Sequence, residues 1–270
     1  MKITLPHLLA LTLVLLIVWS AASAPVPLPE QGRLGGSAEI PIREVLTTIA
    51  AENDAVRSLY TKKIVGEGKK VGLNFDEDWE EENVQAGPLP ALFLSKAAES
   101  LQKQQIGIEL ILGSHMPITP TNAFKGDQVT RFERILKTRE PEFFTDSRTN
   151  LETAMFPDVA GVQACVTCHN EHPSSPKTDW ALNDVMGATT WSYPHATVSE
   201  AEYLQIVAGV RRAFRDAYRS YLAEIESFEN KPEIGAQWPA DGFFVPNEET
   251  FMAAFEKEIT IKTMNRLLPK

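Results

Sequence analysis

The residues best suited to chemistry in this chain are its two cysteines and the histidine that follows them. Cys165 and Cys168 are the only cysteines among 270 residues, and His169 comes directly after the second, which gives the spacing C-x-x-C-H. This spacing is the attachment signature of c-type haem. One helical turn separates two thiols that would form thioether bonds to the haem vinyl groups, and the following imidazole would bind the iron from the proximal side. The sequence predicts one covalently bound haem c.

Three other chemistries use the same residue types. A dithiol redox motif is also C-x-x-C, but it normally opens a helix in an early βαβ unit, whereas this pair lies past the middle of the chain. A zinc site needs four ligands, and Cys165, Cys168, His169 and His172 would have to supply them although two are adjacent. A disulfide across two residues closes a very small loop and stabilises little. Haem remains the favoured prediction.

The first 24 residues have the features of a secretory signal peptide. A positive start at Lys2 precedes an apolar run from Leu5 to Trp19 and the small-residue cleavage site Ala22-Ser23-Ala24. Because the run is short for a membrane-spanning helix, we expect cleavage and no stable membrane anchor afterwards; retention as an anchor stays open. Bacterial c-type haem is attached outside the inner membrane, so export and haem agree, and together they predict a periplasmic protein.

The charge balance narrows the choice of partners. The chain has 26 basic and 36 acidic residues and a net charge of −10. An acidic surface argues against nucleic acid or an anionic membrane as the partner. It fits plain solubility or docking to a basic redox protein.

The chain reads as an α+β protein. Helices are predicted before, between and after an antiparallel set of strands, and the first helix is expected to end at Gly66 and Gly68. The predicted helices cover 41–64, 91–104, 127–137, 199–228 and 247–267, and the predicted strands cover 106–112, 142–145, 150–156 and 187–193. We expect a signal peptide (1–24), a flexible lead-in (25–38), a haem domain (39–198) and a C-terminal helical extension packed on it (199–270).

The segment from Ala164 to Gly187 resembles a known family, the periplasmic monohaem c-type domains with a PAS-like fold. These domains of unknown function occur alone or ahead of adenylate or guanylate cyclases and histidine kinases. The shared pattern C-x-x-C-H-N-x-H-P-x-S-P-K-x-D-W is matched by Cys165, Cys168, His169, Asn170, His172, Pro173, Ser175, Pro176, Lys177, Asp179 and Trp180. The resemblance extends more weakly over the upstream elements.

The resemblance implies a PAS-like antiparallel sheet that holds the haem, long helices outside it, and a redox or gas-sensing role. Two departures matter. Some relatives take a distal haem ligand from a further cysteine, which this sequence lacks. The chain also carries no cyclase or kinase, so a signal would pass to a separate protein.

Several other residues are candidates for the haem site. Met155 or Met186 is favoured as the distal iron ligand, ahead of His115, because thioether and imidazole are usual sixth ligands. His172 lies too close to His169 to reach across the iron, so a propionate or backbone contact suits it. Lys177 is expected to pair with a propionate and Trp180 to pack on the macrocycle. Each of these residues is also an ordinary core or surface residue.

Two functions follow from these features. The first is a sensor module whose haem reports redox state or a diatomic gas to a periplasmic partner. The alternative is an electron-transfer cytochrome or a subunit of an oxidoreductase. No Ser/His/Asp triad, phosphate loop or glycosidase carboxylate pair is recognised, so an enzyme such as a peroxidase ranks third. The long terminal helices would serve a monomer or a homodimer equally well.

Overall fold

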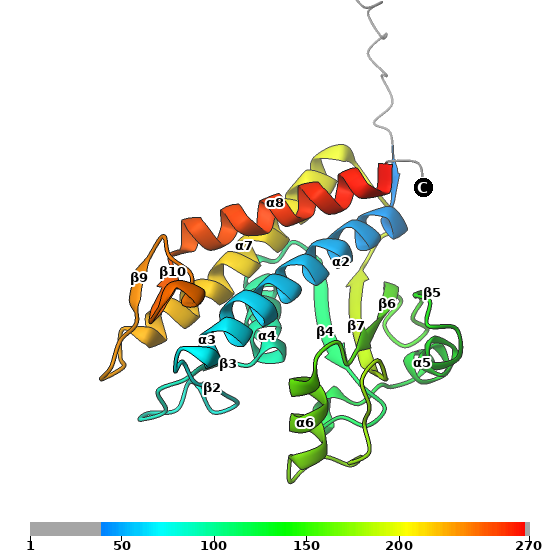
Figure 1. The fold of residues 1–270 in the computed structure, drawn as a ribbon. Coiled ribbons are helices and arrows are strands. Elements are labelled where there is room, and N and C mark those ends of the chain that lie inside the picture. The colour runs from blue at the N-terminus through cyan, green and yellow to red at the C-terminus, as the bar shows by residue number, and fades with distance from the viewer. Residues whose placement is uncertain (1–38, 268–270) are drawn as a thin grey trace, which may run out of the picture. The chain divides into compact units, whose positions relative to one another are not determined.

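The computed structural model describes residues 39–267, with side chains up to residue 260. The predicted signal peptide (1–24) and lead-in (25–38) lie outside these residues. The described part combines long helices with one antiparallel sheet of four strands (Figure 1). The predicted α+β class is confirmed.

The long helices begin where the sequence supplies a start signal. Pro41 precedes α2, Pro90 opens α4, and Ser199 caps α7: its hydroxyl accepts from the Glu202 backbone N–H while the Glu202 carboxylate accepts from the Ser199 N–H. Within the described part of the chain, no helix is both long enough and apolar enough to cross a bilayer. The bounds are α2 Ile42–Leu59, α4 Pro90–Gln104, α7 Glu200–Ile225 and α8 Glu248–Leu267.

The first helix runs further than predicted. It continues from α2 through the π-helical segment η1 (Tyr60–Gly66) and the final turn α3 (Glu67–Lys70), so Gly66 and Gly68 do not end it. Gly68 is buried, and a Cβ added there would lie 3.0 Å from Leu73 Cδ1. Its role is close packing. The left-handed turn after the helix is made by Gly72, with φ of 100°.

One aromatic core joins helices that are far apart in the sequence. Tyr60 of η1 stacks on Phe93 of α4 with ring centroids 4.4 Å apart, and meets Tyr221 of α7 edge-on at 6.3 Å. Tyr218 of α7 stacks on Phe251 of α8 at 3.9 Å. Such contacts add to the free energy gained from burial alone. This core contains residues from both sides of the predicted boundary after residue 198.

The sheet has the order β4-β7-β6-β5 with all neighbours antiparallel. The predicted strands are confirmed within a few residues, except that the first begins later than expected because Gly107 adopts a φ of 78°. The central strand β7 is buried along its whole length. The bounds are β4 Glu109–Gly113, β5 Glu142–Thr145, β6 Glu152–Val159 and β7 Val185–Tyr193.

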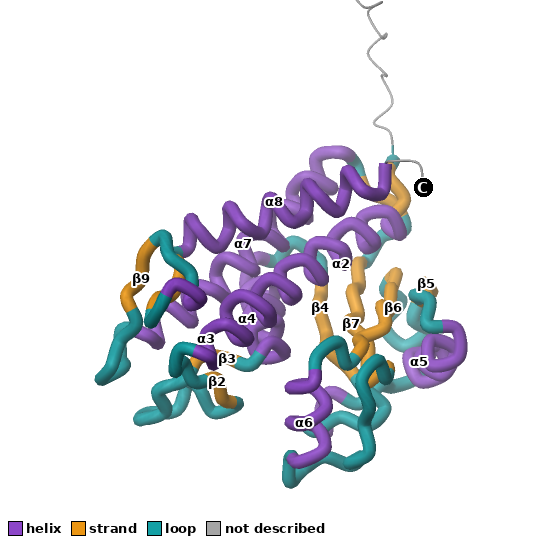
Figure 2. The backbone as a smooth tube through the Cα atoms, in the orientation of Figure 1, coloured by secondary structure: helices purple, strands orange, loops and turns teal. Residues whose placement is uncertain are grey.

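The two faces of the sheet serve different layers, as the period-2 alternation requires. Ala154 and Trp191, which face each other on β6 and β7, belong to the core shared with α2. The adjacent Met155 points the other way and packs with Phe132 of α5 (Asp127–Thr138). The strands therefore lie between α2 on one side and α5 on the other (Figure 2).

Six short strands were not predicted. They form three pairs, and strands of two or three residues carry no periodic signal because their backbone hydrogen bonds depend on a partner elsewhere in the chain. The pairs are β1 (Ile40–Pro41) with β8 (Thr197–Val198), β2 (Phe75–Asp76) with β3 (Gly87–Pro88), and β9 (Glu233–Gly235) with β10 (Phe244–Pro246).

Gly187 allows β7 to approach β4 closely. A Cβ at this position would lie 2.3 Å from the carbonyl oxygen of Gly113, which is too close for any side chain. We expect Gly187→Ala to lower the free energy of unfolding by about 1–3 kcal/mol, since the strands must separate, as measured by urea denaturation. Gly235→Ala is the control, because a Cβ there meets nothing within 4 Å. Equal stabilities of the two variants would contradict this account.

Candidate functional site

The C-x-x-C-H segment forms helix α6 (Gln163–Glu171), which joins β6 to β7 and stands at one end of the sheet (Figure 1). In a helix, residues three and four apart share a flank, so Cys165, Cys168 and His169 lie along one side of α6. Val166 lies on the core side, 6% exposed, and packs with Trp180 and Met186. The packing of Val166 holds α6 against the core and so fixes the position of the three motif residues.

Both thiols are free, Cys165 half-buried and Cys168 exposed. Although the residue is exposed, partial enclosure of its sulfur, with a smaller effect from Glu77, raises the pKa of the Cys168 thiol. Redox-active dithiols have a lowered pKa that provides a reactive thiolate. The environment of Cys168 therefore disfavours the dithiol redox alternative.

His169 lies between the flank of α6 and the core. Burial lowers its pKa, so the imidazole is neutral at pH 7, and the neutral ring is the form that binds a metal. Its Nδ1 is buried without a hydrogen-bond partner, and so is Nε1 of Trp180, whose ring stands perpendicular to the imidazole at a centroid distance of 6.5 Å. Buried polar atoms without a partner are typical of sites that take up an additional group or water.

The loop after α6 is folded back onto Trp180. Asn170 Nδ2 donates to the Trp180 carbonyl at 3.0 Å, and the Trp180 N–H donates to Asn170 Oδ1 at 2.8 Å. Lys177 Nζ lies 4.7 Å from the centre of the indole ring and pairs with Asp179. The residues beyond C-x-x-C-H therefore build a support that fixes Trp180, and with it the ring of His169. Trp180 and Lys177, predicted as cofactor contacts, both belong to this support.

His172 connects the end of α6 to the loop after β2. Its Nδ1 accepts from the Ser174 N–H at 3.1 Å, so the proton is on Nε2, which lies 2.9 Å from a Glu77 carboxylate oxygen. Both ring nitrogens are thus engaged, which leaves neither for a zinc ion. Among residues 39–260, no three His, Cys, Asp or Glu side chains converge as metal ligands.

The candidate distal ligands lie in different surroundings. Met155 is fully buried among α5 side chains on the sheet face away from α2. Met186 is the unpaired residue of a β-bulge, since Asp158 faces Gly187 and Val159 faces Val185. Its side chain packs with Val166 and Trp180. The His115 ring lies 6.2 Å from the Trp180 ring on the side of α5. Met186 thus shares a hydrophobic cluster with Val166 of the motif helix, whereas Met155 belongs to the cluster with α5.

Sequence reasoning missed one feature of the site, an ion pair beside the motif. Arg57 of α2 and Asp158 of β6 pair at 2.5 Å between Nη1 and Oδ1. Burial lowers the pKa of His169, Asp158 raises it and Arg57 lowers it, so both charges act on the imidazole. The signal in the sequence was an acidic residue, Asp158, that follows Ala154 and Phe156 in the α2-facing series of β6, a series that begins at Glu152.

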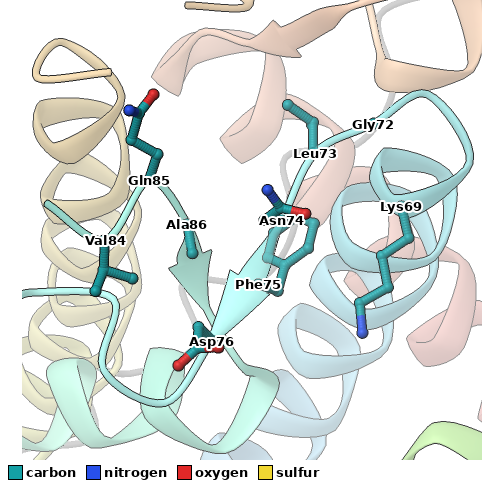
Figure 3. Close-up of a pocket in the computed structure, with 9 residues that line it drawn as sticks. All are labelled: Lys69, Gly72, Leu73, Asn74, Phe75, Asp76, Val84, Gln85 and Ala86. Carbon is teal, nitrogen blue, oxygen red and sulfur yellow. The ribbon is translucent and has the colours of Figure 1, made fainter. Parts of the chain in front are cut away.

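A depression of about 510 Å³ lies beside β2 (Figure 3), which precedes the Glu77 that bonds to His172. It is lined by the end of α3, the segment through β2 and residues 84–86 before β3, with Lys69, Asn74, Asp76 and Gln85 among its side chains, and no residue of α6 contributes to it. Lys69 lowers the pKa of Cys168, opposing the effect of Glu77. The depression therefore borders the candidate site without forming part of it.

A family model described as Tll0287-like matches residues 36–194. This chain belongs to the Tll0287-like family. It is the monohaem cytochrome domain family to which the motif pointed, and the Tll0287-like match runs from β1 through β7 and includes α6. α7 and α8 lie beyond the matched range. No curated protein and no solved structure shows significant similarity to the chain.

The two hydrogen bonds between Asn170 and the Trp180 backbone provide a test of the support around Trp180. We expect Asn170→Ala to lower the free energy of unfolding by about 1–3 kcal/mol, because it removes both partners of the buried Trp180 backbone groups, as measured by chemical denaturation. Asn170→Asp keeps the acceptor for the Trp180 N–H and loses the donor, so we expect an intermediate stability. If Asn170→Ala were as stable as the wild type, the loop would not depend on these two hydrogen bonds.

Proposed function

We propose that the chain binds one haem c through thioether bonds at Cys165 and Cys168, with His169 as the proximal iron ligand. The observation that carries the proposal is the common flank of α6 that presents two free thiols and a neutral imidazole. Membership of a cytochrome-like family supports it. When bound, the haem supplies a one-electron redox couple and an iron that can take a small ligand.

The side chains of the site have separate tasks in this proposal. Val166 anchors the helix, Trp180 limits the rotation of the His169 ring, and Asn170 holds Trp180 in place. A ring held by its neighbours keeps one ligation geometry, which is how surrounding residues tune a bound metal. The candidate contacts of Lys177, His172 and Trp180 with the haem remain proposals.

We propose that the haem serves as a redox or gas sensor. Met155 is enclosed among α5 side chains, and Met186 packs with Val166 on the core side of α6. These positions favour an iron whose sixth site is open to a diatomic ligand, although ligation by either methionine stays an alternative. The antiparallel sheet β4-β7-β6-β5, with α5 on one face, supports a PAS-like scaffold.

The second candidate is periplasmic electron transfer. The exposed Cys168 supports it, because a thioether there would bring one edge of the haem to the surface. The net charge of −10 suits a basic redox partner. In both cases we propose an exported protein of the periplasm that acts on a separate protein, as a monomer or a homodimer.

The visible spectrum distinguishes the two functions. The full-length protein, expressed in a bacterium that attaches c-type haem, is recorded oxidised and reduced, with and without CO. A high-spin spectrum that shifts with CO is expected for the sensor. A low-spin spectrum with the weak far-red band of sulfur ligation and no CO shift would support electron transfer instead. A protein without covalent haem would refute the proposal.

A further inference from the structure

The ion pair between Arg57 and Asp158 is the most enclosed pair of opposite charges next to α6. The Arg57 side chain is 24% exposed and that of Asp158 is 22% exposed, so each keeps less than a quarter of its contact with water. Arg57 lies in the last turn of α2, just before the π-helical segment η1. Asp158 lies near the end of β6, 101 positions further along the chain.

The strand geometry explains how Asp158 reaches this position. Along β6, Ala154, Phe156 and Asp158 share the face that packs against α2, and the first two contribute to the apolar core. The bulge at Met186 follows directly after Asp158. Bulges increase the local twist and redirect side chains, often next to functional sites. A carboxylate on this face requires a cation opposite, and α2 supplies Arg57.

Both charges lie beside the segment that leads into the motif helix. β6 ends at Val159 and α6 begins at Gln163, and Ala160 between them is buried in one cluster with Val166, Trp180 and Met186, against which Cys165 packs. Besides its bond to Asp158, Arg57 interacts electrostatically with Cys165 and, more weakly, with Asp54. Guanidinium has five N–H donors, and the bond to Asp158 uses one of them. The pair thus places one charge of each sign beside the motif, with little water between them to screen it.

We propose that Arg57 and Asp158 are positioning residues that set the reduction potential of the haem by balancing each other's charge beside His169. The inference rests on the proposed binding of haem c. Oxidised haem carries one more positive charge than reduced haem. A nearby cation therefore favours the reduced state and a nearby anion the oxidised state. Because the two charges are paired, their effects on the potential largely cancel in the wild-type protein.

The balance predicts opposite effects for the two single variants. Asp158→Asn removes the carboxylate that is bonded to Arg57 and leaves only the weaker interaction with Asp54, so it should raise the ratio of reduced to oxidised protein at a fixed solution potential. Arg57→Gln leaves Asp158 unopposed and should lower it. We expect a change of about tenfold in each direction, equivalent to about 59 mV for a one-electron couple. The double variant Arg57→Gln/Asp158→Asn removes both charges and should return to within about twofold of the wild type.

The test is a spectroelectrochemical titration of the haem-loaded, full-length proteins. Glu142→Gln is the matched control: its ion pair with Arg131, at side-chain exposures of 18% and 29%, joins β5 to α5 away from the motif, and it should leave the ratio within about twofold. A purely structural role would move both single variants in the same direction. Shifts of the same sign, or no larger than that of Glu142→Gln, would overturn the inference.

Two further results keep the inference separate from the proposed function. A wild-type protein without covalent haem refutes both. Should either single variant fail to fold, Arg57→Lys keeps the charge but not the forked geometry. It must then stay within about twofold of the wild type, with the double variant matching it; a larger shift in Arg57→Lys would overturn the charge-balance account.

Discussion

We expect the double variant Cys165→Ser/Cys168→Ser to lose covalent haem attachment completely. No other cysteine exists in the chain, so no alternative thioether can form, and non-covalent haem would be lost on denaturation. The measurement is the mass of the denatured protein together with its absorbance after acid–solvent extraction. Each single variant, Cys165→Ser or Cys168→Ser, should retain one thioether bond and bind haem less completely.

The control for this experiment lies inside the same helical turn. Thr167 is exposed and occupies one of the two variable positions of C-x-x-C-H, so Thr167→Ala should keep the covalent haem at the wild-type level. Haem that stays attached to the double cysteine variant after denaturation would contradict the assignment. So would the loss of haem from Thr167→Ala, since that position supplies no bond to the haem.

Trp180→Ala is expected to have the largest effect on stability of any change near the site. The indole is 6% exposed and contacts Val166, His115, His169 and Lys177. Truncating a buried aromatic residue of this size lowers the free energy of unfolding by about 3–5 kcal/mol, as measured by urea denaturation. A haem-loaded variant should also show a broader, more heterogeneous spectrum, because the His169 ring loses the surface that limits its rotation.

Two control variants test whether the lower free energy of unfolding comes from the lost packing of Trp180. Trp180→Phe keeps an aromatic ring against His169 and should recover a large part of the loss. Leu204→Ala changes a residue that is 58% exposed on α7 and should alter the free energy of unfolding by no more than about 0.5 kcal/mol. A loss below about 1 kcal/mol in Trp180→Ala would show that the loop repacks without the indole.

The elements with local signals were predictable from the sequence. Ser199 marked the start of α7, and the period-2 run from Ile106 to Leu112 marked the strand β4. The end of α2 was misjudged, because glycine in a helix signals either termination or close packing. The contact between Gly68 and Leu73 that decides the case is visible only in three dimensions.

The candidate site also contains features that the sequence predicts and features that it does not. The spacing of Cys165, Cys168 and His169 is local, so the sequence sufficed to place them together on α6. The ion pair Arg57–Asp158 and the bond from His172 to Glu77 join positions 101 and 95 residues apart. No periodicity in a single sequence links such distant residues. The packing of α2 on the sheet brings Arg57 to Asp158, and the loop after β2 brings Glu77 to His172.

The two hydrogen bonds between Asn170 and Trp180 have a consequence for the order in which the protein folds. They close a loop of only 10 residues, and the contacts of Lys177 with Asp179 and of Ser175 with the Lys177 carbonyl span 2 residues each. Closing short loops loses little chain entropy, and segments rich in local contacts form early. We expect residues 163–181 to reach a native-like arrangement before the four strands pair. The two thiols would then have their final spacing while the rest of the chain is still unfolded.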